Sequence, residues 1–372
     1  MTTHTIETTT SPLAATLETF FDTKTACNLE GTMSYFSPNL ASYIDATLGW
    51  DLGSYDALKA VFARYMPNWS PPARSYATGV LSNETSALVR MVDTPELFGG
   101  ELRILAAIDF ADGKIVRWVD YWDASSFDGE LYAQFRTPAD AFPKDLKDGQ
   151  VPTRAAPELV AAATALQQAF RAADAPAAAS LMHTDVVLED MSLRTQVIGR
   201  IEASHYLGRI LGDAPYGRSS QLRHVVGGRP GGGFEWTAGP NADTLAGITA
   251  LELDAGGLIT KITSVYDSRQ LTPDRKRYLI ALPSRSSDTL GVSDPEELAC
   301  ASVGGCRGLP PWSGTLLVLA GAEASASLVL SHRCTTGHTH EGDRWRTTSR
   351  PRLRAIASEP CRNLKLGSRS PR

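Results

Sequence analysis

The spacing of hydrophobic positions changes along the first third of the chain. Up to residue 66, apolar side chains mostly recur every three or four residues, as on one face of an amphipathic helix. Beyond the proline pair at 71–72, β-branched and aromatic residues dominate and turn residues follow at short intervals. The pattern predicts helices from Pro12, over 29–36 and from Ser54 to Pro67, and strands over 40–45, 75–81, 86–93, 101–110 and 114–123.

The same order of elements returns in the second third of the chain. The pattern predicts helices over 159–173, 177–183 and from Gly199, and strands over 185–190, 222–226, 234–237, 244–253 and 258–267. Asp45 and Asp190 are 145 residues apart, and Trp122 and Tyr266 are 144 apart. This near-constant offset favours an internal duplication over a chance similarity between two unrelated domains.

Each repeat places helices before an antiparallel meander, which is typical of an α+β fold rather than of alternating β-α-β units. We therefore expect two tandem cone-shaped units, each a curved antiparallel sheet wrapped around about three helices, followed by an irregular tail. The expected domains are a first unit over 13–135, a proline-containing linker over 136–158, a divergent second unit over 159–275, and a low-order basic tail over 276–372.

The charge distribution separates the tail from the rest of the chain. Residues 281–372 contain 12 Lys and Arg against 8 Asp and Glu, a net charge of +4. Because the whole chain has a net charge of −5, residues 1–280 carry −9. An acidic body argues against a nucleic-acid ligand. The tail is rich in Ser, Arg, Gly and Pro, and disorder is the default expectation for such a composition.

Other classes of protein are disfavoured by specific absences. No apolar run reaches the length of a membrane span, and the N-terminus lacks the basic and apolar regions of a signal peptide. Cys27 is the one cysteine before residue 300, which fits a reducing compartment, so we expect a cytoplasmic protein. The Cys and His residues of the tail match no standard zinc spacing, and we expect no metal and no cofactor.

The stretch 114–123 is the most informative of the predicted strands. Strand side chains alternate between faces, so Trp118, Asp120 and Trp122 share one face. A carboxylate between two indoles is desolvated, which raises its pKa and prepares it for proton transfer. The alternative is a salt-bridged aspartate on a partly solvated sheet.

Residues 13–135 contain no histidine, so proton transfer there requires carboxylates, Tyr, Lys or water. Asp45, Asp93 and Asp120 form a workable acid–base set, because neighbouring carboxylates share a proton near neutral pH. For each acid the alternative is a surface or capping role. We expect an apolar pocket wall, with plain core packing as the alternative, from Trp50, Phe62, Tyr65, Trp69, Trp118 and Trp122.

The element order and the closing sequence Gly113-Lys114-Ile115 with Asp120-Tyr121-Trp122-Asp123 resemble the SnoaL-like branch of the nuclear-transport-factor-like superfamily. That branch includes polyketide cyclases, limonene-epoxide-hydrolase-like enzymes and epoxide-opening cyclases. The resemblance implies a cone-shaped fold with a deep apolar pocket. It identifies the reaction poorly, because this fold hosts many activities.

The resemblance also implies roles for individual residues. Asp120 matches the aspartate of the closing strand, Asp93 matches its partner, and Tyr43 with Asp45 matches a Tyr-x-Asn pair in which Asp replaces Asn. The place of the family's arginine is taken by Met91, and Arg90 should face the other way by strand alternation. Arg103, across the hairpin, is the candidate replacement.

The second unit departs from the first at the proposed catalyst, because Ser264 takes the place of Asp120. Pocket-lining candidates remain, and these are Asp190, Tyr206, Trp236 and Tyr266. The glycine-rich stretch 227–233 is expected to be a loop. We therefore interpret this half as a divergent copy and expect any chemistry in the first.

The leading hypothesis is a SnoaL-like enzyme of secondary metabolism. It would act as an acid–base isomerase or cyclase, or as an epoxide-opening hydrolase, on an apolar small molecule. The first alternative is a protein that binds an apolar ligand without chemistry. The second is a dimerisation module, in which the two units form a pseudo-dimer within one chain or the chain forms a homodimer.

Overall fold

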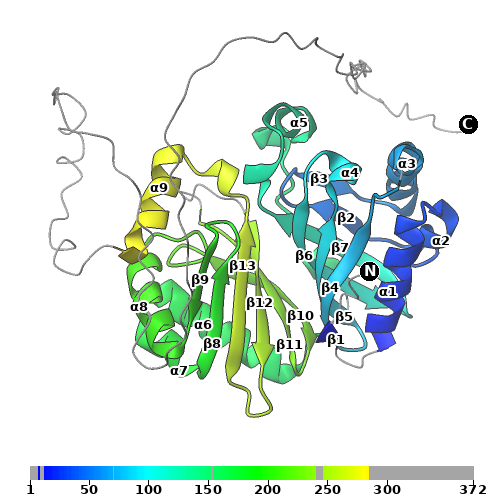
Figure 1. Cartoon of the computed structure of the whole chain (residues 1–372). Coiled ribbons are helices and arrows are strands. Elements are labelled where there is room, and N and C mark those ends of the chain that lie inside the picture. Colours follow the sequence, from blue (N-terminus) through cyan, green and yellow to red (C-terminus); the bar gives the residue numbers. More distant parts are fainter. Residues whose placement is uncertain (1–6, 9–11, 70, 152–153, 240–245, 285–372) are drawn as a thin grey trace, which may run out of the picture. The chain divides into compact units, whose positions relative to one another are not determined.

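The computed structural model describes residues 7–8, 12–69, 71–151, 154–239 and 246–284, and all of them belong to one compact unit, Met1–Ala299 (Figure 1). This unit contains two β-sheets, each with its own helices. The expectations for residues 285–372, including the irregular tail, lie outside the described residues.

The first domain has the predicted helices and strands in the predicted order. Its sheet follows the order β1-β4-β5-β6-β7-β2-β3, in which β7 pairs antiparallel with β6 and parallel with β2. The parallel pairing makes the sheet mixed rather than purely antiparallel. Its elements are β1 (Glu7–Thr8), α1 (Pro12–Thr25), α2 (Leu29–Met33), β2 (Ser42–Asp45), β3 (Trp50–Leu52), α3 (Tyr55–Tyr65), β4 (Ser75–Ser82), β5 (Ser86–Asp93), α4 (Pro95–Phe98), β6 (Leu102–Ala111), β7 (Lys114–Trp122) and α5 (Gly129–Phe135).

Four short elements of this domain were not predicted: β1, β3, α4 and α5. None is longer than seven residues, too short for a hydrophobic period to be visible. Strand β3 forms because β2 supplies its partners, with Asp45 opposite Trp50. The predicted helix start at Ser54 is confirmed, since its side chain accepts a hydrogen bond from the Ala57 backbone N–H at 3.1 Å.

The second domain repeats this topology. Its sheet follows the order β10-β11-β12-β13-β8-β9, and the parallel pairing of β13 with β8 corresponds to that of β7 with β2. The matching strand order supports the predicted duplication. Its elements are α6 (Pro157–Ala172), α7 (Ala175–Ser180), β8 (Met182–Asp190), β9 (Thr195–Ile198), α8 (Arg200–Ile210), β10 (Gln221–Gly228), β11 (Gly231–Thr237), β12 (Ala246–Leu253), β13 (Ile259–Tyr266) and α9 (Pro273–Ala281). Helix α9 continues past residue 275, where we expected the domain to end.

The glycine-rich stretch 227–233 is a β-hairpin and not the expected loop. Strands β10 and β11 enclose only Arg229 and Pro230 as a turn. A side chain at Gly228 would come within 2.2 Å of the Ser82 carbonyl oxygen, and one at Gly233 within 2.7 Å of Leu88. These glycines therefore allow the second sheet to approach the first closely.

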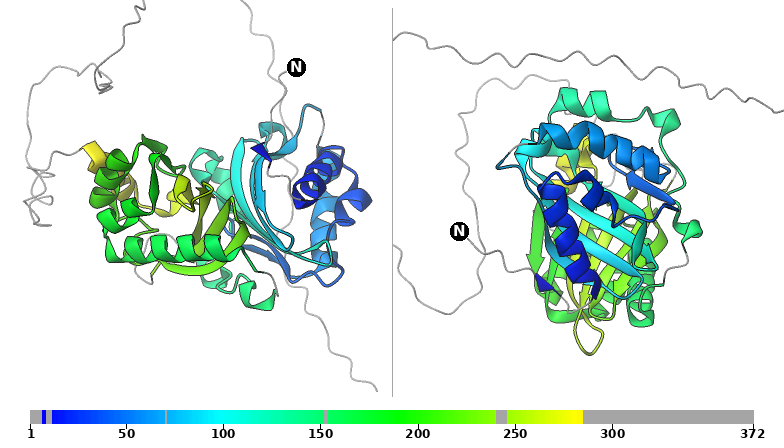
Figure 2. Two further views of the ribbon diagram at one scale, coloured as in Figure 1. Left: turned by 90° about the horizontal axis from the view of Figure 1, so that it is seen from below. Right: turned by 90° about the vertical axis from the view of Figure 1, so that its right-hand side faces the viewer.

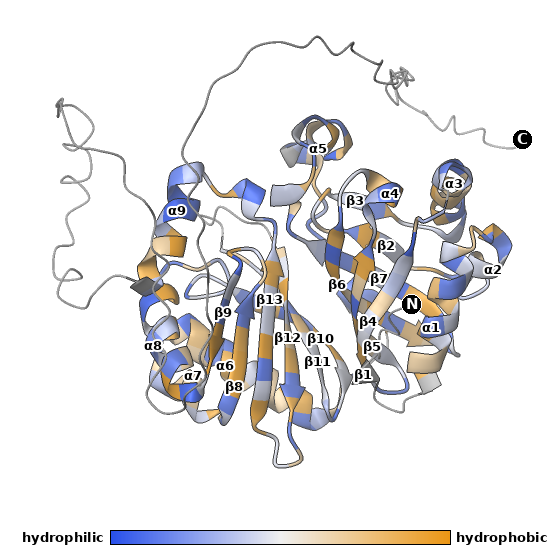
Figure 3. Ribbon diagram, viewed as in Figure 1, coloured by the Kyte–Doolittle hydropathy of each residue, from blue (hydrophilic) through white to orange (hydrophobic). Residues whose placement is uncertain are grey.

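The two sheets pack face to face, with helices α1 and α2 on the outer side of the first sheet and α6, α7 and α8 on that of the second (Figure 2). Apolar residues of both sheets fill this layer, including Val119 and Tyr121 of β7 and Ile248 and Val265 of the second domain. Figure 3 shows hydrophobic positions concentrated on the strands, interrupted by polar ones. Strand β7 thus contributes to two cores, one on each of its faces.

Buried charges lie within the layer between the sheets. Arg117 is fully buried and pairs with Asp109 at 2.9 Å and with Glu235 of the second domain at 2.8 Å. The Tyr121 hydroxyl also donates to Glu235, at 2.7 Å. The predicted alternation of β7 is confirmed, since Arg117 and Tyr121 face the second domain whereas Trp118 and Trp122 face the core of the first.

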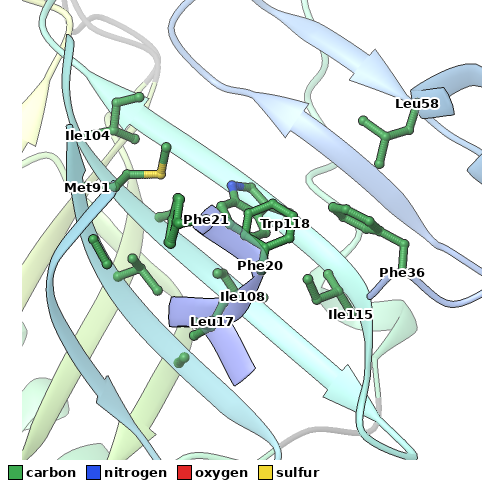
Figure 4. Close-up of a cluster of buried hydrophobic side chains, with 14 of the residues drawn as sticks. Leu17, Phe20, Phe21, Phe36, Leu58, Met91, Ile104, Ile108, Ile115 and Trp118 are labelled. Atoms are coloured by element: carbon green, nitrogen blue, oxygen red, sulfur yellow. The ribbon is translucent and has the colours of Figure 1, made fainter. Parts of the chain in front are cut away.

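Helix α1 fills the inner side of the first sheet. Phe20 and Phe21, from its predicted stripe, pack against Trp118 with ring centroids 5.3 and 6.4 Å apart (Figure 4). Phe36 completes this cluster at 6.3 Å from the same indole. The helices do not fill the other end of the sheet's inner face completely, and a cavity remains there.

Candidate functional site

The first domain encloses a cavity of about 100 Å³ between its sheet and its helices. Tyrosine and aspartate side chains from the strands and one lysine from α1 line it, and the rest of its wall is apolar. Its polar lining residues are Lys24, Tyr43, Asp45, Asp93 and Asp120. Its apolar lining residues include Trp50, Leu58, Phe62, Tyr65, Trp69, Phe98, Ile104, Trp122, Phe127 and Phe135.

Asp120 is buried and is held by two aromatic side chains. Its side chain accepts a hydrogen bond from the Tyr43 hydroxyl at 2.5 Å and one from the Trp118 indole N–H at 2.6 Å, and only 4% of the residue is exposed. Burial is the main cause that raises the pKa of Asp120 to about 7, and the negative charge of Asp45 adds to it. The hydrogen bonds from Tyr43 and Trp118 oppose this rise.

Asp45 lies beside Asp120, because β2 and β7 run parallel with these two residues in register. It accepts hydrogen bonds from the backbone N–H groups of Thr47 and Leu48, both at 2.9 Å, and from the Trp122 indole at 3.1 Å. Burial raises the pKa of Asp45 to about 6, against the lowering effect of these donors. Two neighbouring carboxyls therefore change protonation close to neutral pH.

Tyr43 connects β2 to the same group. Its ring stacks on Trp118 at 5.8 Å, and its hydroxyl donates to Asp120. Burial and the nearby carboxylates raise the pKa of Tyr43 well above its usual value, so the phenol stays protonated. Tyr43 acts here as a hydrogen-bond donor.

Asp93 and Lys24 form an ion pair at the cavity, with Lys24 Nζ 3.5 Å from Asp93 Oδ1. Both residues are at most 4% exposed, and Ser75 Oγ donates to the same carboxylate. Lys24 was not predicted as a site residue. It lies four residues after Phe20 and three after Phe21, and therefore on the apolar stripe of α1. A cation on an apolar stripe is the sequence feature that could have predicted its place at the site.

Most of the predicted aromatic wall lines the cavity. Trp50, Phe62, Tyr65, Trp69 and Trp122 do so, and Trp50 stacks on Tyr65 at 6.5 Å. Trp118 is the exception. Its indole packs in the hydrophobic core against α1 and reaches the site only through its hydrogen bond to Asp120.

Arg103 lies outside this cavity, which corrects its expected role. Its neighbour Ile104 faces the cavity, and alternation along β6 turns Arg103 to the opposite side, where it pairs with Glu101 at 2.8 Å and is mostly exposed. Arg90 also faces away, as predicted, and pairs with Glu252 of the second domain. The cation at the cavity is therefore Lys24 rather than an arginine.

The corresponding region of the second domain is packed with aromatic side chains. Tyr216 lies 6.3 Å from Trp236 and 6.2 Å from Tyr266, and Tyr206 is buried beside them. The Tyr266 hydroxyl donates to Asp190 at 3.4 Å, and burial raises the pKa of Asp190 to about 7. The four predicted residues of this half are thus brought together, but in a core of their own that is separate from the first domain's cavity.

Ser264 replaces the carboxyl of Asp120 with a neutral hydrogen-bond chain. Its hydroxyl lies 2.9 Å from that of Thr249, which accepts a hydrogen bond from the Trp236 indole at 3.1 Å. This arrangement satisfies the buried polar groups without a titratable side chain. The second domain therefore lacks the paired carboxyls of the first.

Two searches of the described residues were negative. No group of three or more His, Cys, Asp and Glu side chains in them is arranged to hold a metal ion. None of the helices in the same residues has the length and hydrophobicity needed to cross a membrane.

Comparison with known proteins gave no match to a family model and none to a curated protein. Solved structures do match. An NTF-2 like protein of unknown function from Burkholderia xenovorans is 16% identical and covers 31% of this chain and 93% of its own, with a TM-score of 0.25. A steroid delta-isomerase from Pseudomonas aeruginosa is 14% identical and covers 41% of this chain and 98% of its own, with a TM-score of 0.29.

A protein from Silicibacter pomeroyi described as having a cystatin-like fold is 15% identical and covers 38% of this chain and 92% of its own, with a TM-score of 0.27. Both domains described above have the α+β organisation that the closing motif of the first domain implied. The structure shows two α+β domains with matching strand orders, and membership of the nuclear-transport-factor-like superfamily stays a prediction from the closing motif.

Proposed function

We propose that the first domain is an acid–base enzyme that moves a proton on a small apolar molecule. The observation that supports this most strongly is the placement of Asp45 and Asp120 in register on adjacent strands, at one side of an apolar cavity. Their pKa values of about 6 and about 7 are close to the pH at which such an enzyme would work.

The difference between the two carboxyls suggests their roles. Burial raises the pKa of Asp120 further than that of Asp45, so we assign Asp45 as the base and Asp120 as the proton donor. Because the two groups interact, the pair titrates together, and proton uptake by one favours release from the other. Tyr43 and Trp118 hold the Asp120 carboxyl in place throughout.

Lys24 has a separate part in this proposal. Its ammonium group faces the cavity from α1, beside Asp93. A cation in a site from which water is largely excluded stabilises negative charge that develops on a substrate oxygen. We assign Lys24 the role of stabilising the negative charge on that oxygen. Asp93 holds the Lys24 ammonium group in position, and Ser75 holds Asp93.

The volume of the cavity restricts the substrate. Cavities of roughly 150 Å³ hold one benzene ring, so about 100 Å³ admits a molecule of at most about that size without movement of the wall. An unsaturated carbonyl compound that undergoes a double-bond shift fits this description, and so does a small epoxide that is opened by water. These are the isomerase and hydrolase forms of the same acid–base chemistry. A cyclase reaction on a larger polyketide-like substrate requires the wall to open.

The test is turnover and binding of two small probes, cyclohex-3-enone and cyclohexene oxide. We expect conversion of one of them to the conjugated enone or to the diol, and a loss of about 10²- to 10⁴-fold in Asp120→Asn, as is usual when a general acid or base is removed. Asp56→Asn, which makes the same change at an exposed position of α3, is the matched control.

A contrary result would be tight binding of both probes without conversion, unchanged in the double variant Asp45→Asn with Asp120→Asn. That outcome would favour the binding-protein alternative.

A further inference from the structure

The rim of the cavity is built by the segment Ala124–Phe135, which includes α5. Phe127 and Phe135 of this segment line the cavity, and the Trp50 indole donates to the Phe135 carbonyl oxygen at 2.7 Å. The segment 124–135 therefore forms part of the cavity wall.

Helix α5 has seven residues, too few to be stable without tertiary contacts. The segment 124–135 packs on its own domain through Phe127, which precedes α5, and through Leu131 and Phe135 of α5. Its other side faces the second domain. There the Tyr132 hydroxyl donates to Asp267 Oδ2 at 2.5 Å, and this hydrogen bond joins the first domain to the second.

Arg269 adds three contacts to the same segment. Its Nε donates to the Ala124 carbonyl oxygen at 3.0 Å, a second guanidinium nitrogen donates to the Phe127 carbonyl oxygen, and the guanidinium lies 4.8 Å from the centre of the Tyr132 ring. Asp267 also accepts a hydrogen bond from the Ala124 backbone N–H, at 3.3 Å. The rim segment is thus tied at Ala124, Phe127 and Tyr132 to the turn that follows β13.

We propose that the second domain positions the rim of the first domain's cavity, with Asp267 and Arg269 as its positioning residues. The second domain has lost the paired carboxyls, yet it supplies contacts to α5 that the first domain does not. The negative charge of Asp267 also acts on the site, since it contributes to the raised pKa of Asp45. The inference concerns the cavity itself and holds whichever reaction takes place there.

The test is hydrogen–deuterium exchange of the full chain, together with binding of fluorobenzene followed by 19F NMR. Asp267→Asn and Tyr132→Phe each weaken the bond between α5 and the second domain. We expect exchange in 124–135 to become at least about 10-fold faster in both variants, with fluorobenzene affinity lowered several-fold, because a hydrogen bond to a charged group is lost. The rest of the interface should exchange as before.

Glu252→Gln is the matched control, since it removes a different contact between the domains, the ion pair with Arg90. It should leave both the exchange of 124–135 and the affinity for fluorobenzene unchanged. The proposal is overturned if Tyr132→Phe and Asp267→Asn exchange like the wild type, or if Glu252→Gln loosens 124–135 equally. Should Asp267→Asn fail to fold, Tyr132→Phe alone decides. Neither measurement depends on turnover, so failure of the proposed function would leave this result standing.

Discussion

Asp120 and Asp45 occupy surroundings that oppose their ionisation, and this has a cost in stability. Between about pH 4 and pH 7 the folded chain keeps a proton on Asp120 that the unfolded chain has already lost. The folded state then binds more protons than the unfolded state, so the free energy of unfolding falls as the pH rises through this window. A buried carboxyl that reduces stability is typical of a residue retained for chemistry.

Replacing Asp120 with Asn should therefore have opposite effects on stability and on activity. The amide cannot ionise, and at pH 8 we expect Asp120→Asn to be more stable than the wild type by on the order of 1 to 4 kcal/mol. At pH 4, where both forms are neutral, the difference should vanish. Urea denaturation at the two pH values measures this. Equal stability of the two proteins at pH 8 would show that Asp120 is not desolvated.

At the same scale, alternation along strands predicted the site only in part. Asp45, Asp93, Asp120 and Tyr43 do converge on one cavity, because each lies on the inner face of its strand. The pattern could not say which face of β6 was inner, and Arg103 was placed on the wrong one. Lys24 was overlooked because spacing shows that a residue lies on a helical stripe but not what lies opposite it.

At the scale of elements, long segments with a clear period were predictable and short ones were not. Helix α1 and strands β4 to β7 follow from hydrophobic spacing, whereas β3 and α5 exist because neighbours pair with them or pack on them. The glycine-rich hairpin shows the same limit. Glycine indicated a loop by local preference, but the close approach of Ser82 and Leu88 explains why glycines form strands there.

At the scale of the whole chain, the two domains meet through contacts that repeat at the internal offset of 144. Asp123 accepts a hydrogen bond from the Ser268 backbone N–H, and Asp267 accepts one from that of Ala124. Such reciprocal pairs are typical of a two-fold interface between like subunits. Here they occur between two copies within one chain.

The buried charges then indicate which copies can pair. Tyr121 and Val265 are equivalent positions, 144 residues apart. In the first sheet Arg90 lies two strands away from Tyr121 in the same row of paired residues, and in the second sheet Glu235 lies two strands away from Val265. Arg90 therefore corresponds to Glu235. Arg117 meets Glu235 across the interface, so the same contact between two first domains would oppose Arg117 and Arg90. Two like charges in a buried layer are strongly unfavourable.

We therefore expect this face to be satisfied within the chain and the protein to be a monomer. Light scattering during size-exclusion chromatography should give the 40.0 kDa mass of one chain. The charge argument predicts that this mass stays constant as the protein concentration is raised. A mass of about twice that value would mean that the chain forms a homodimer, either through a different surface or because the two domains do not pair within one chain.

The central claim is that Asp120 and Asp45 exchange protons near neutral pH, and carboxyl 13C NMR of protein labelled at aspartate measures this directly. The spectra of Asp120→Asn and Asp45→Asn assign the two signals and separate them from that of Asp190, which should also titrate near pH 7. The proposal predicts midpoints of about 7 for Asp120 and about 6 for Asp45. Midpoints of both signals near the ordinary value of about 4 would contradict it.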